Sequence, residues 1–295
     1  MVKIKILNET DEKLQVLLSK TDRSFANALR RSLISDTPKM AIDSVTFQLG
    51  TKEQDEEIWE TTGPIPDEMV AQRLAMIPIP TVHDKFYFQD ECPNCKDMVE
   101  EERGCVECQM IYTCVVFGSE EGRWVTAGDM KYLGEGSLEI TDEYKSIPIT
   151  KLLKGQMIEF YATAIMGRGR EHTKWSPVCG VSFHPRRIGV LNNKKKAKIL
   201  WDMDLEISAK DFDKDGKMKD IDKVSILTNE LNHVGEGTEE SREFGDAVTL
   251  EEVSGEFILE FETDGSMGPK VAFMKAVEEL SATFGSLEQD LSAAL

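Results

Sequence analysis

The hydrophobic pattern at the start of the chain changes from a period of two residues to a helical period. Apolar and basic residues alternate over 2–6, which predicts a half-buried strand, and a second alternation over 14–18 predicts its hairpin partner. Asp22 is a candidate N-cap for a helix over 23–35, and Pro38 stops that helix. One face of this helix is predicted to hold Phe25, Ala28, Leu29 and Ser32.

The middle of the chain predicts further strands with polar connections between them. Strands are expected at 45–49, 111–117 and 156–167. A short helix is expected at 67–76, ending before the two prolines of "MIPIP". From about residue 194 to residue 245 the sequence is polar and resembles an insertion.

The C-terminal part predicts a strand at 257–261 and a final helix after Pro269. The apolar residues of this helix are spaced by alternating steps of four and three: Phe273, Val277, Leu280, Phe284, Leu287 and Leu291. This spacing is typical of a coiled-coil seam. The seam could pack on the chain's own sheet or on a helix of a partner, and the spacing alone leaves both interpretations open.

Composition excludes some classes of function. The 295 residues suggest two or three domains, and 54 acidic against 35 basic residues give a net charge of −19. Nucleic-acid binders usually carry the opposite charge, so direct sequence-specific DNA binding is not expected, whereas docking to basic partner proteins fits. The start of the chain lacks the pattern of a secretory signal, and no apolar run approaches the roughly 18 residues of a membrane span. We therefore expect a cytoplasmic protein without a membrane segment.

Four of the six cysteines form two C-x-x-C pairs, Cys92 with Cys95 and Cys105 with Cys108. Disulfides are disfavoured in a reducing cytosol, whereas four thiolates at this spacing can surround one Zn²⁺ tetrahedrally. We expect a structural zinc that replaces the missing apolar core of this loop. An iron–sulfur cluster is the main alternative, although the C-x-x-C-x-x-C spacing of ferredoxins is absent. Cys114 and Cys179 are expected to be buried as small apolar residues.

A weak calcium-loop candidate lies in "DFDKDGKMKDID". Asp211, Asp213 and Asp215 occupy positions 1, 3 and 5 of an EF-hand loop, and Asp222 occupies position 12. Position 12 prefers glutamate, and the preceding residues 201–210 alternate like a strand rather than a helix. An exposed acidic turn is therefore the favoured interpretation. The sequence contains neither a phosphate-binding glycine loop nor a nucleophile elbow, so no catalytic residues are expected in this chain.

Several stretches together resemble one family in the right order along the chain. They are "ANALRRSLISDTPKMAID", "DEMVAQRLAMIPIP", "GRGREHTKWSPV" and "FETDGSMGPKVAFMKAVEEL". The chain resembles the alpha-like assembly subunits of RNA polymerase, in particular the archaeal D-type subunits and their relatives, the third-largest subunit of eukaryotic polymerase II and the bacterial alpha N-terminal domain.

The resemblance implies an α+β fold with a discontinuous dimerisation domain. That domain would comprise 1–40 and 247–295, with a mainly-β domain at 41–186 inserted and carrying the metal-binding cysteine loop 92–108. A further polar insertion, 187–246, lies where some archaeal relatives carry a ferredoxin-like domain with clusters. This region of the present chain contains no cysteine, so the resemblance does not extend to those clusters.

The function implied by the resemblance is that of a non-catalytic platform in DNA-dependent RNA polymerase, the nucleotidyltransferase that makes RNA from ribonucleoside triphosphates. The chain would form a heterodimer with the small L-type subunit, and the N-type and P-type subunits would join before the large catalytic subunits. Partner contacts are expected from the C-terminal seam and from Phe25, Leu29, Arg30 and Arg31. The alternative is an acidic, zinc- or calcium-dependent protein-binding module outside polymerase.

Overall fold

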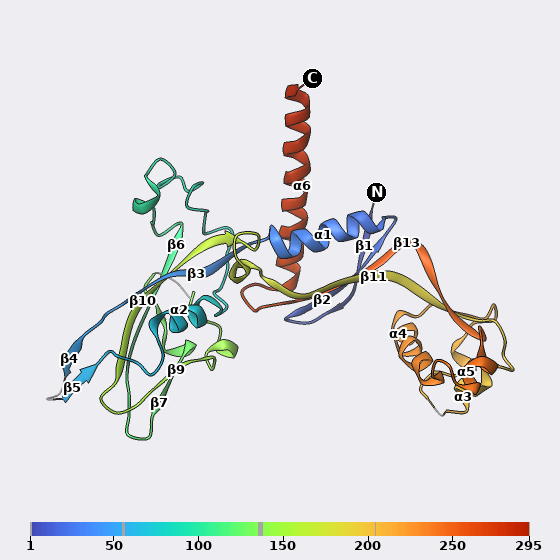
Figure 1. Ribbon diagram of the computed structural model, residues 1–295. Helices are drawn as coiled ribbons and strands as arrows, with labels where there is room; N and C mark the ends of the chain where they lie inside the picture. Colours follow the sequence, from blue (N-terminus) through green and yellow to red (C-terminus); the bar gives the residue numbers. More distant parts are fainter. Residues whose placement is uncertain (1, 55–56, 135–137, 204, 295) are drawn as a thin grey trace. The chain divides into compact units, whose positions relative to one another are not determined.

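The computed structural model describes residues 2–54, 57–134, 138–203 and 205–294. The chain forms two compact units (Figure 1). The first contains Met1–Leu7, Gln15–Asn27 and Ser182–Leu259, and the second contains Asn8–Leu14, Ala28–Val181 and Glu260–Leu295. Strands and helices are mixed in this architecture, which confirms the predicted α+β class.

The second unit contains a four-stranded antiparallel sheet in the order β3-β10-β6-β8. Its strands are β3 (Pro38–Phe47), β10 (Met157–Arg168), β6 (Gln109–Phe117) and β8 (Lys131–Tyr132). Alternate residues of β6, from Met110 to Val116, are buried, as the period of two requires. Helix α2 (Asp67–Ala75) contributes Val70 and Leu74 to the same core.

Two small sheets complete the strands of this unit. β4 (Thr51–Gln54) pairs with β5 (Glu57–Glu60), and β7 (Arg123–Thr126) pairs with β9 (Pro148–Leu152). Both pairs are antiparallel.

A five-stranded sheet has the order β1-β2-β13-β11-β12. Its strands are β1 (Lys3–Glu9), β2 (Lys13–Ser19), β13 (Val248–Thr263), β11 (Val178–Leu191) and β12 (Lys217–Met218). Helix α1 (Arg23–Ser35) follows β2, and the Asp22 carboxylate accepts a hydrogen bond from the Phe25 N–H at 2.8 Å. The predicted helix and its N-cap are therefore confirmed.

The polar insertion has a core of its own within the first unit. It contains α3 (Lys198–Trp201), α4 (Ile221–Glu230) and α5 (Glu239–Phe244). The buried residues of this core are Ala197, Leu200, Ile207, Phe212, Met218, Val224, Leu227, Val234, Phe244, Ala247 and Val248. The insertion is thus a folded element with an apolar interior, although its sequence is polar on average.

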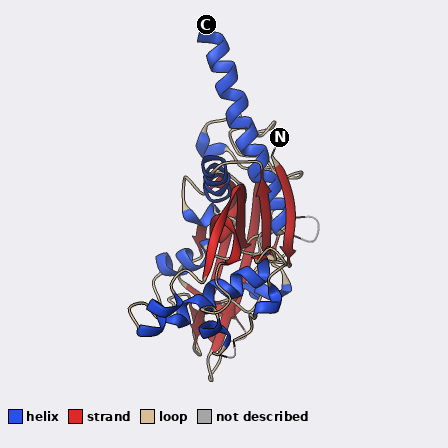
Figure 2. Cartoon of the chain, turned by 90° about the vertical axis from the view of Figure 1, so that its right-hand side faces the viewer, coloured by secondary structure: helices blue, strands red, loops and turns tan. Residues whose placement is uncertain are grey.

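The C-terminal helix α6 (Pro269–Ala294) is continuous in both views (Figures 1 and 2). Its first two turns are anchored in the second unit, because Ala272, Phe273 and Ala276 are buried. The Phe273 ring stacks on Phe261 with 6.4 Å between the ring centroids. Among the described residues, no helix is long and apolar enough to cross a membrane.

Three local predictions were wrong. The strand predicted at 45–49 begins at Pro38 and ends at Phe47, so Leu49 lies outside it and is 74% exposed. The strand predicted at 201–210 does not form: Trp201 ends α3, Ala209–Asp211 is a 3-10 turn, and residue 204 lies outside the described residues. Cys179 is exposed, whereas Cys114 is buried as expected.

Candidate metal centre and dimerisation surface

The four cysteines of the two C-x-x-C pairs converge on one point. Their sulfur atoms all lie within 4.8 Å of one another, and the Cys92–Cys105, Cys105–Cys108 and Cys108–Cys95 pairs are 3.5, 3.7 and 3.8 Å apart. These distances exceed the roughly 2.05 Å of a disulfide, and all four cysteines are free. Among the described residues, this is the only group of three or more His, Cys, Asp or Glu side chains placed to hold a metal ion.

The local sequence explains this convergence. Each C-x-x-C pair closes a tight turn, in which Cys92 O accepts the Cys95 N–H at 3.1 Å and Cys105 O accepts the Cys108 N–H at 3.0 Å. Gly104 enters the second turn with φ +148°, and a Cβ there would lie 2.5 Å from the Gln109 side chain. A residue without a Cβ is needed at this point.

Burial and hydrogen bonding shift the pKa values of these thiols in different directions. Burial raises the pKa of the Cys92 and Cys108 thiols. Burial also acts on Cys105, but hydrogen bonds from the Glu107 N–H and from the other thiols lower its pKa to about 7. One sulfur is thus ready to ionise near neutral pH, and a bound cation favours the thiolate form of the others.

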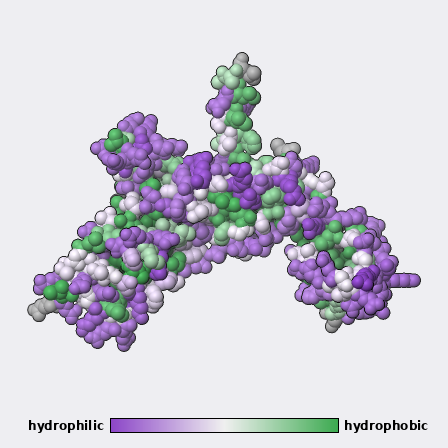
Figure 3. All heavy atoms as spheres, in the orientation of Figure 1, coloured by the Kyte–Doolittle hydropathy of each residue, from purple (hydrophilic) through white to green (hydrophobic). Residues whose placement is uncertain are grey.

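The seam of α6 is divided between the chain's own core and its surface. Phe273 is buried, whereas Val277 is 38% exposed and Leu280 is half-buried. The later seam residues Phe284, Leu287 and Leu291 are 58%, 62% and 60% exposed. Figure 3 shows hydrophobic residues along this part of the helix. The two interpretations of the seam therefore apply to different halves of one helix.

The candidate interface residues of α1 differ in their accessibility. Leu29 is fully buried, Phe25 and Arg30 are half-buried, and Arg31 is exposed. The Ser32 hydroxyl donates a hydrogen bond of 2.9 Å to Ala276 O, which fixes the end of α1 to α6. Leu29 and Phe273 thus pack inside the chain. Arg31 and the outer half of α6 are exposed, and Phe25 and Arg30 are partly accessible.

A buried ionic network, which the sequence reasoning did not single out, lies around the "GREHTKWSP" segment. Lys39 is 3% exposed; its ammonium group donates to Lys174 O at 2.8 Å and is paired with Asp264. Lys174 in turn pairs with Asp43 at 2.6 Å and lies 4.2 Å from the centroid of the Trp175 ring. Charged residues beside a tryptophan were the only signal in the sequence.

The same segment makes a close approach to α1. A Cβ on Gly169 would lie 2.0 Å from Ile34 O, so only glycine fits there. His172 Nδ1 accepts the Lys174 N–H at 3.1 Å, so this histidine has a structural hydrogen bond. The segment therefore connects β10 with the end of α1 and, through the hydrogen bond from the Asp264 N–H to Pro177 O at 3.1 Å, with the loop that precedes α6.

The four aspartates of the calcium-loop candidate are not brought together. The Asp211 carboxylate accepts hydrogen bonds from Ser208 and Lys223, and Asp213 accepts the N–H groups of Asp215 and Lys217. Asp222 lies in the first turn of α4. These carboxylates support the turn and its helix, so the exposed acidic turn is the better description.

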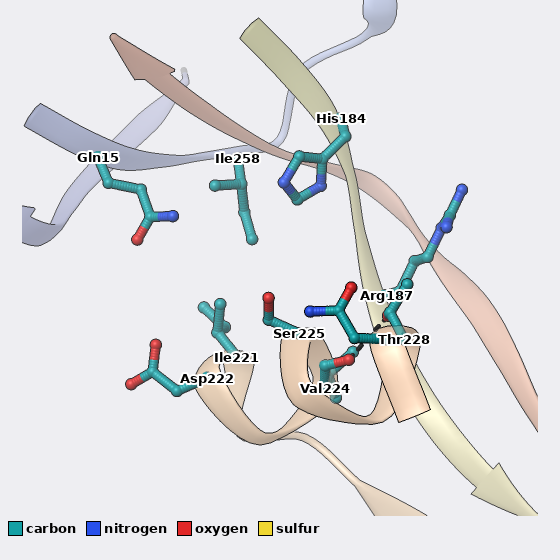
Figure 4. A pocket seen from close by; sticks show the side chains of 10 residues that line it. Gln15, His184, Arg187, Ile221, Asp222, Val224, Ser225, Thr228 and Ile258 are labelled. Atoms are coloured by element: carbon teal, nitrogen blue, oxygen red, sulfur yellow. Dashed lines mark hydrogen bonds between the residues drawn. The ribbon is translucent and has the colours of Figure 1, made fainter. Parts of the chain in front are cut away.

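A cavity of about 310 Å³ lies between α4 and the strands of the first unit (Figure 4). Its lining includes His184, Arg187 and Asp222. His184 Nδ1 is 3.2 Å from Pro185 O, and Arg187 lies 3.7 Å from the Glu252 carboxylate. The His184 and Arg187 side chains are therefore engaged with the chain itself.

Comparison with known proteins shows which family the chain is similar to. The model of the RNA polymerase Rpb3/Rpb11 dimerisation domain matches residues 15–284. The chain is 30% identical to DNA-directed RNA polymerase subunit Rpo3 of Thermoplasma volcanium, over 99% of this chain and 100% of that protein. It is also 30% identical to Rpo3 of Picrophilus torridus, over 97% of this chain and 98% of that protein. The polymerase II subunit rpb3 of Dictyostelium discoideum is 32% identical over 65% of this chain and 60% of its own length.

The matched region includes most of β2, the strands β11, β12 and β13, and most of α6, and the two archaeal relatives match nearly the whole chain. The chain therefore belongs to the Rpb3/Rpb11 dimerisation-domain family, as an Rpo3-type subunit of DNA-directed RNA polymerase.

Proposed function

We propose that this chain is a non-catalytic assembly subunit, which pairs with a small L-type subunit and then carries the N-type and P-type subunits and the large catalytic subunits. The observation that carries the proposal is the outer half of α6. Phe284, Leu287 and Leu291 are each more than half exposed, although they continue the seam whose first residue is buried. An apolar stripe of this kind is typical of an interface with another helix.

The proposed subunit has the domains predicted from the sequence. Residues 1–40 and 247–295 form the dimerisation domain, 41–186 the inserted domain with its cysteine loop, and 187–246 a separate insertion. The pairing of Lys39 with Asp264 supports this arrangement, because it joins the end of the first segment to the last segment. The relatives named above are all polymerase subunits, so the alternative of a module outside polymerase gains no support.

The proposed occupant of the cysteine site is a single structural zinc ion. A tetrahedron with zinc–sulfur bonds of about 2.3 Å has sulfur–sulfur edges of about 3.8 Å. The observed separations of 3.5, 3.7 and 3.8 Å fit these edges. An iron–sulfur cluster places several irons and sulfides between the cysteines and needs wider separations.

The test of the assembly proposal is a change in α6 that leaves the chain's own core untouched. Phe284→Asp combined with Leu287→Asp introduces two charges into the exposed seam. We expect the affinity for the L-type subunit to fall at least about 100-fold, since each buried Phe or Leu contributes about 1.5–3 kcal/mol. Isothermal titration or analytical ultracentrifugation of the purified subunits measures this change.

A matched control carries the same charges on another side of the helix. Ser286 and Gln289 are two residues beyond Phe284 and Leu287, which turns them away from the seam. Ser286→Asp with Gln289→Asp should bind the L-type subunit like the unaltered chain. Equal affinities for both double variants would refute the proposed interface.

A further inference from the structure

The insertion carries a group of exposed lysines in a chain that is otherwise strongly acidic. The lysine patch comprises Lys194, Lys195, Lys196, Lys198, Lys214 and Lys217, all of them exposed. The chain as a whole has a net charge of −19. A local concentration of positive charge on such a background has a different electrostatic role from the rest of the surface.

Two segments far apart in sequence form this patch. β11 and β12 pair with Val190 opposite Lys217, and the Leu191 N–H donates to Gly216 O at 2.8 Å. The segment after Leu191 is then turned by Asn193, whose side chain accepts the N–H groups of Lys195 and Lys196 at 3.0 and 3.3 Å. The turn at Lys214 and the run starting at Lys194 therefore lie at the same end of β11.

The backbone that presents the lysines is anchored in the core of the insertion. Ala197 and Leu200 are fully buried, and Met218 is 1% exposed. Each of these residues lies next to a lysine of the patch or within a few residues of one. The ammonium groups thus extend from a packed scaffold, which lowers the entropy lost when they bind a ligand.

The lysines of the patch have no direct ion-pair partner among the described residues. Among the described residues, none of the six ammonium groups forms an ion pair or a hydrogen bond. Asp213, in the same turn, accepts the N–H groups of Asp215 and Lys217 and lies 3.4 Å from the Lys219 ammonium group. Asp213 and Asp215 are both exposed carboxylates of this turn, and the exposed Asp246 lies beside the lysine run, since its carbonyl accepts a hydrogen bond from Asn192 at 2.9 Å. These three carboxylates weaken the local field.

We propose that the lysine patch binds the phosphate backbone of duplex DNA without reading its sequence. Lysines are point charges that neutralise phosphates, and they lack the planar fork with which arginine reads bases. Two aromatic residues of the insertion, Trp201 and Phe212, pack on each other at its core, with Trp201 partly buried and Phe212 buried, and do not form an open platform for unpaired bases. This favours a duplex over a single strand.

The inference rests on polymerase membership only for the presence of DNA beside the chain. Binding to the L-type subunit is measured separately, so that failure of assembly and failure of DNA binding are distinguished. The expected contact is weak and depends on salt, because phosphate neutralisation is its source. A weak contact confined to this patch also agrees with the net charge, which disfavours DNA binding by the surface as a whole.

The experiment measures fluorescence anisotropy of a labelled duplex of mixed sequence with the full chain, alone and with its L-type subunit. The variant Lys194→Glu, Lys195→Glu, Lys196→Glu should lower the affinity at least about tenfold at about 50 mM salt. The slope of log K against log salt should fall by about 2.7, since each lost phosphate contact removes about 0.9. The Lys→Arg triple variant should keep the affinity, and Asp215→Asn should raise it.

The matched control places the same charge change elsewhere. Lys85, Lys96 and Lys131 are exposed lysines that do not belong to the patch, and their replacement by Glu should change the affinity by less than about twofold, because they are not among the residues proposed to contact phosphates. Equal losses in both triple variants, or no loss in either, would overturn the proposal. Tighter binding of a single-stranded RNA through the patch would overturn the assignment to duplex DNA. If the Lys→Glu triple variant of the patch lost another polymerase subunit but bound DNA unchanged, the proposal would be overturned, and the patch would be a docking site for an acidic protein. Thermal unfolding of each variant shows that it is folded.

Discussion

The cysteine loop and the polar insertion are two small excursions of the same chain that are stabilised in different ways. The loop from Cys92 to Cys108 has no apolar core: its only buried cluster consists of the cysteines themselves. The insertion has no cysteine, and its core is built from residues such as Leu200, Phe212 and Leu227. The proposed metal ion takes the place of a core in the first region, and an apolar core makes a metal unnecessary in the second.

This difference also separates the surfaces of the two regions. Six acidic residues of the loop region are exposed: Asp90, Glu91, Asp97, Glu100, Glu101 and Glu102. The Arg103 guanidinium is turned toward the loop backbone, with Nε donating to Met98 O at 3.1 Å. The insertion instead presents its lysine patch. The two excursions should therefore attract partners of opposite charge.

Metal removal should produce the largest effect, and only in the loop. Replacing Cys95 by Ser, or adding a chelator, removes an interaction worth about 10–16 kcal/mol in small zinc sites. Protease sensitivity should appear between residues 92 and 108, while binding of the L-type subunit is kept. Loss of partner binding in the Cys95→Ser protein would show that the loop is coupled to the dimerisation surface.

A charge in the core of the insertion should produce the next largest effect. Leu200 is fully buried, so Leu200→Asp adds an unpaired buried charge to the loss of its packing and should cost more than about 5 kcal/mol. The insertion should unfold, as seen by limited proteolysis, with the metal content unchanged. A drop in bound metal would mean that the two regions do not fold independently.

On acidification, the cysteine loop should release its metal at a different pH from that at which the insertion unfolds. Hydrogen bonding to Lys223 lowers the pKa of Asp211, so its contribution is present above the unfolded value near 3.9 and is lost as the pH falls below about 4. Protons compete with a metal for thiolates whose pKa without the metal is near 8.5, so the metal should be displaced while the pH is still above the range in which Asp211 is protonated. Metal release measured with a colorimetric chelator should therefore precede unfolding of the insertion. The reverse order would contradict the proposed metal ligation.

A helix cap in the insertion should have a moderate effect. Asp220 caps α4 by accepting the Lys223 N–H at 3.0 Å. Asp220→Ala should lower the free energy of unfolding by about 0.5–2 kcal/mol. Urea unfolding measures this value, and Asp220→Asn serves as the control because it keeps the cap.

The smallest effect is expected at the exposed cysteine outside the loop. Cys179 lies on the surface, so Cys179→Ser should change stability by no more than about 0.5 kcal/mol. The metal content of the Cys179→Ser variant, measured by plasma emission spectrometry, should equal that of the unaltered chain. A fall in metal content would place this thiol in the metal site.

The sequence predicted local structure best where one pattern dominated. The cap at Asp22 and the apolar face of 23–35 located α1, because capping and period act within a few residues. The C-x-x-C spacing located the convergent thiols for the same reason. The core of the insertion escaped detection, since Leu200, Met218 and Phe244 are scattered among polar residues and meet only in the folded chain.

The seam of α6 shows the limit of periodicity most clearly. Its spacing is uniform from Phe273 to Leu291, yet Phe273 packs on Phe261 while Leu291 is exposed. Periodicity identifies the apolar face of a helix. It does not show at which residue the chain's own core stops covering that face. The pairing of Lys39 with Asp264 was equally beyond the sequence, because no local pattern connects residues so far apart.

The most direct test is hydrogen exchange on the complex of the chain with its L-type subunit, with and without a chelator. The account predicts that chelation removes protection from the amides of 92–109 alone, and that the amides of 197–248 and of the outer half of α6 stay protected. Loss of protection in α6 or in the insertion after chelation would contradict the claim that the metal stabilises only the cysteine loop. Unchanged exchange in 92–109 would contradict the claim that a metal holds it.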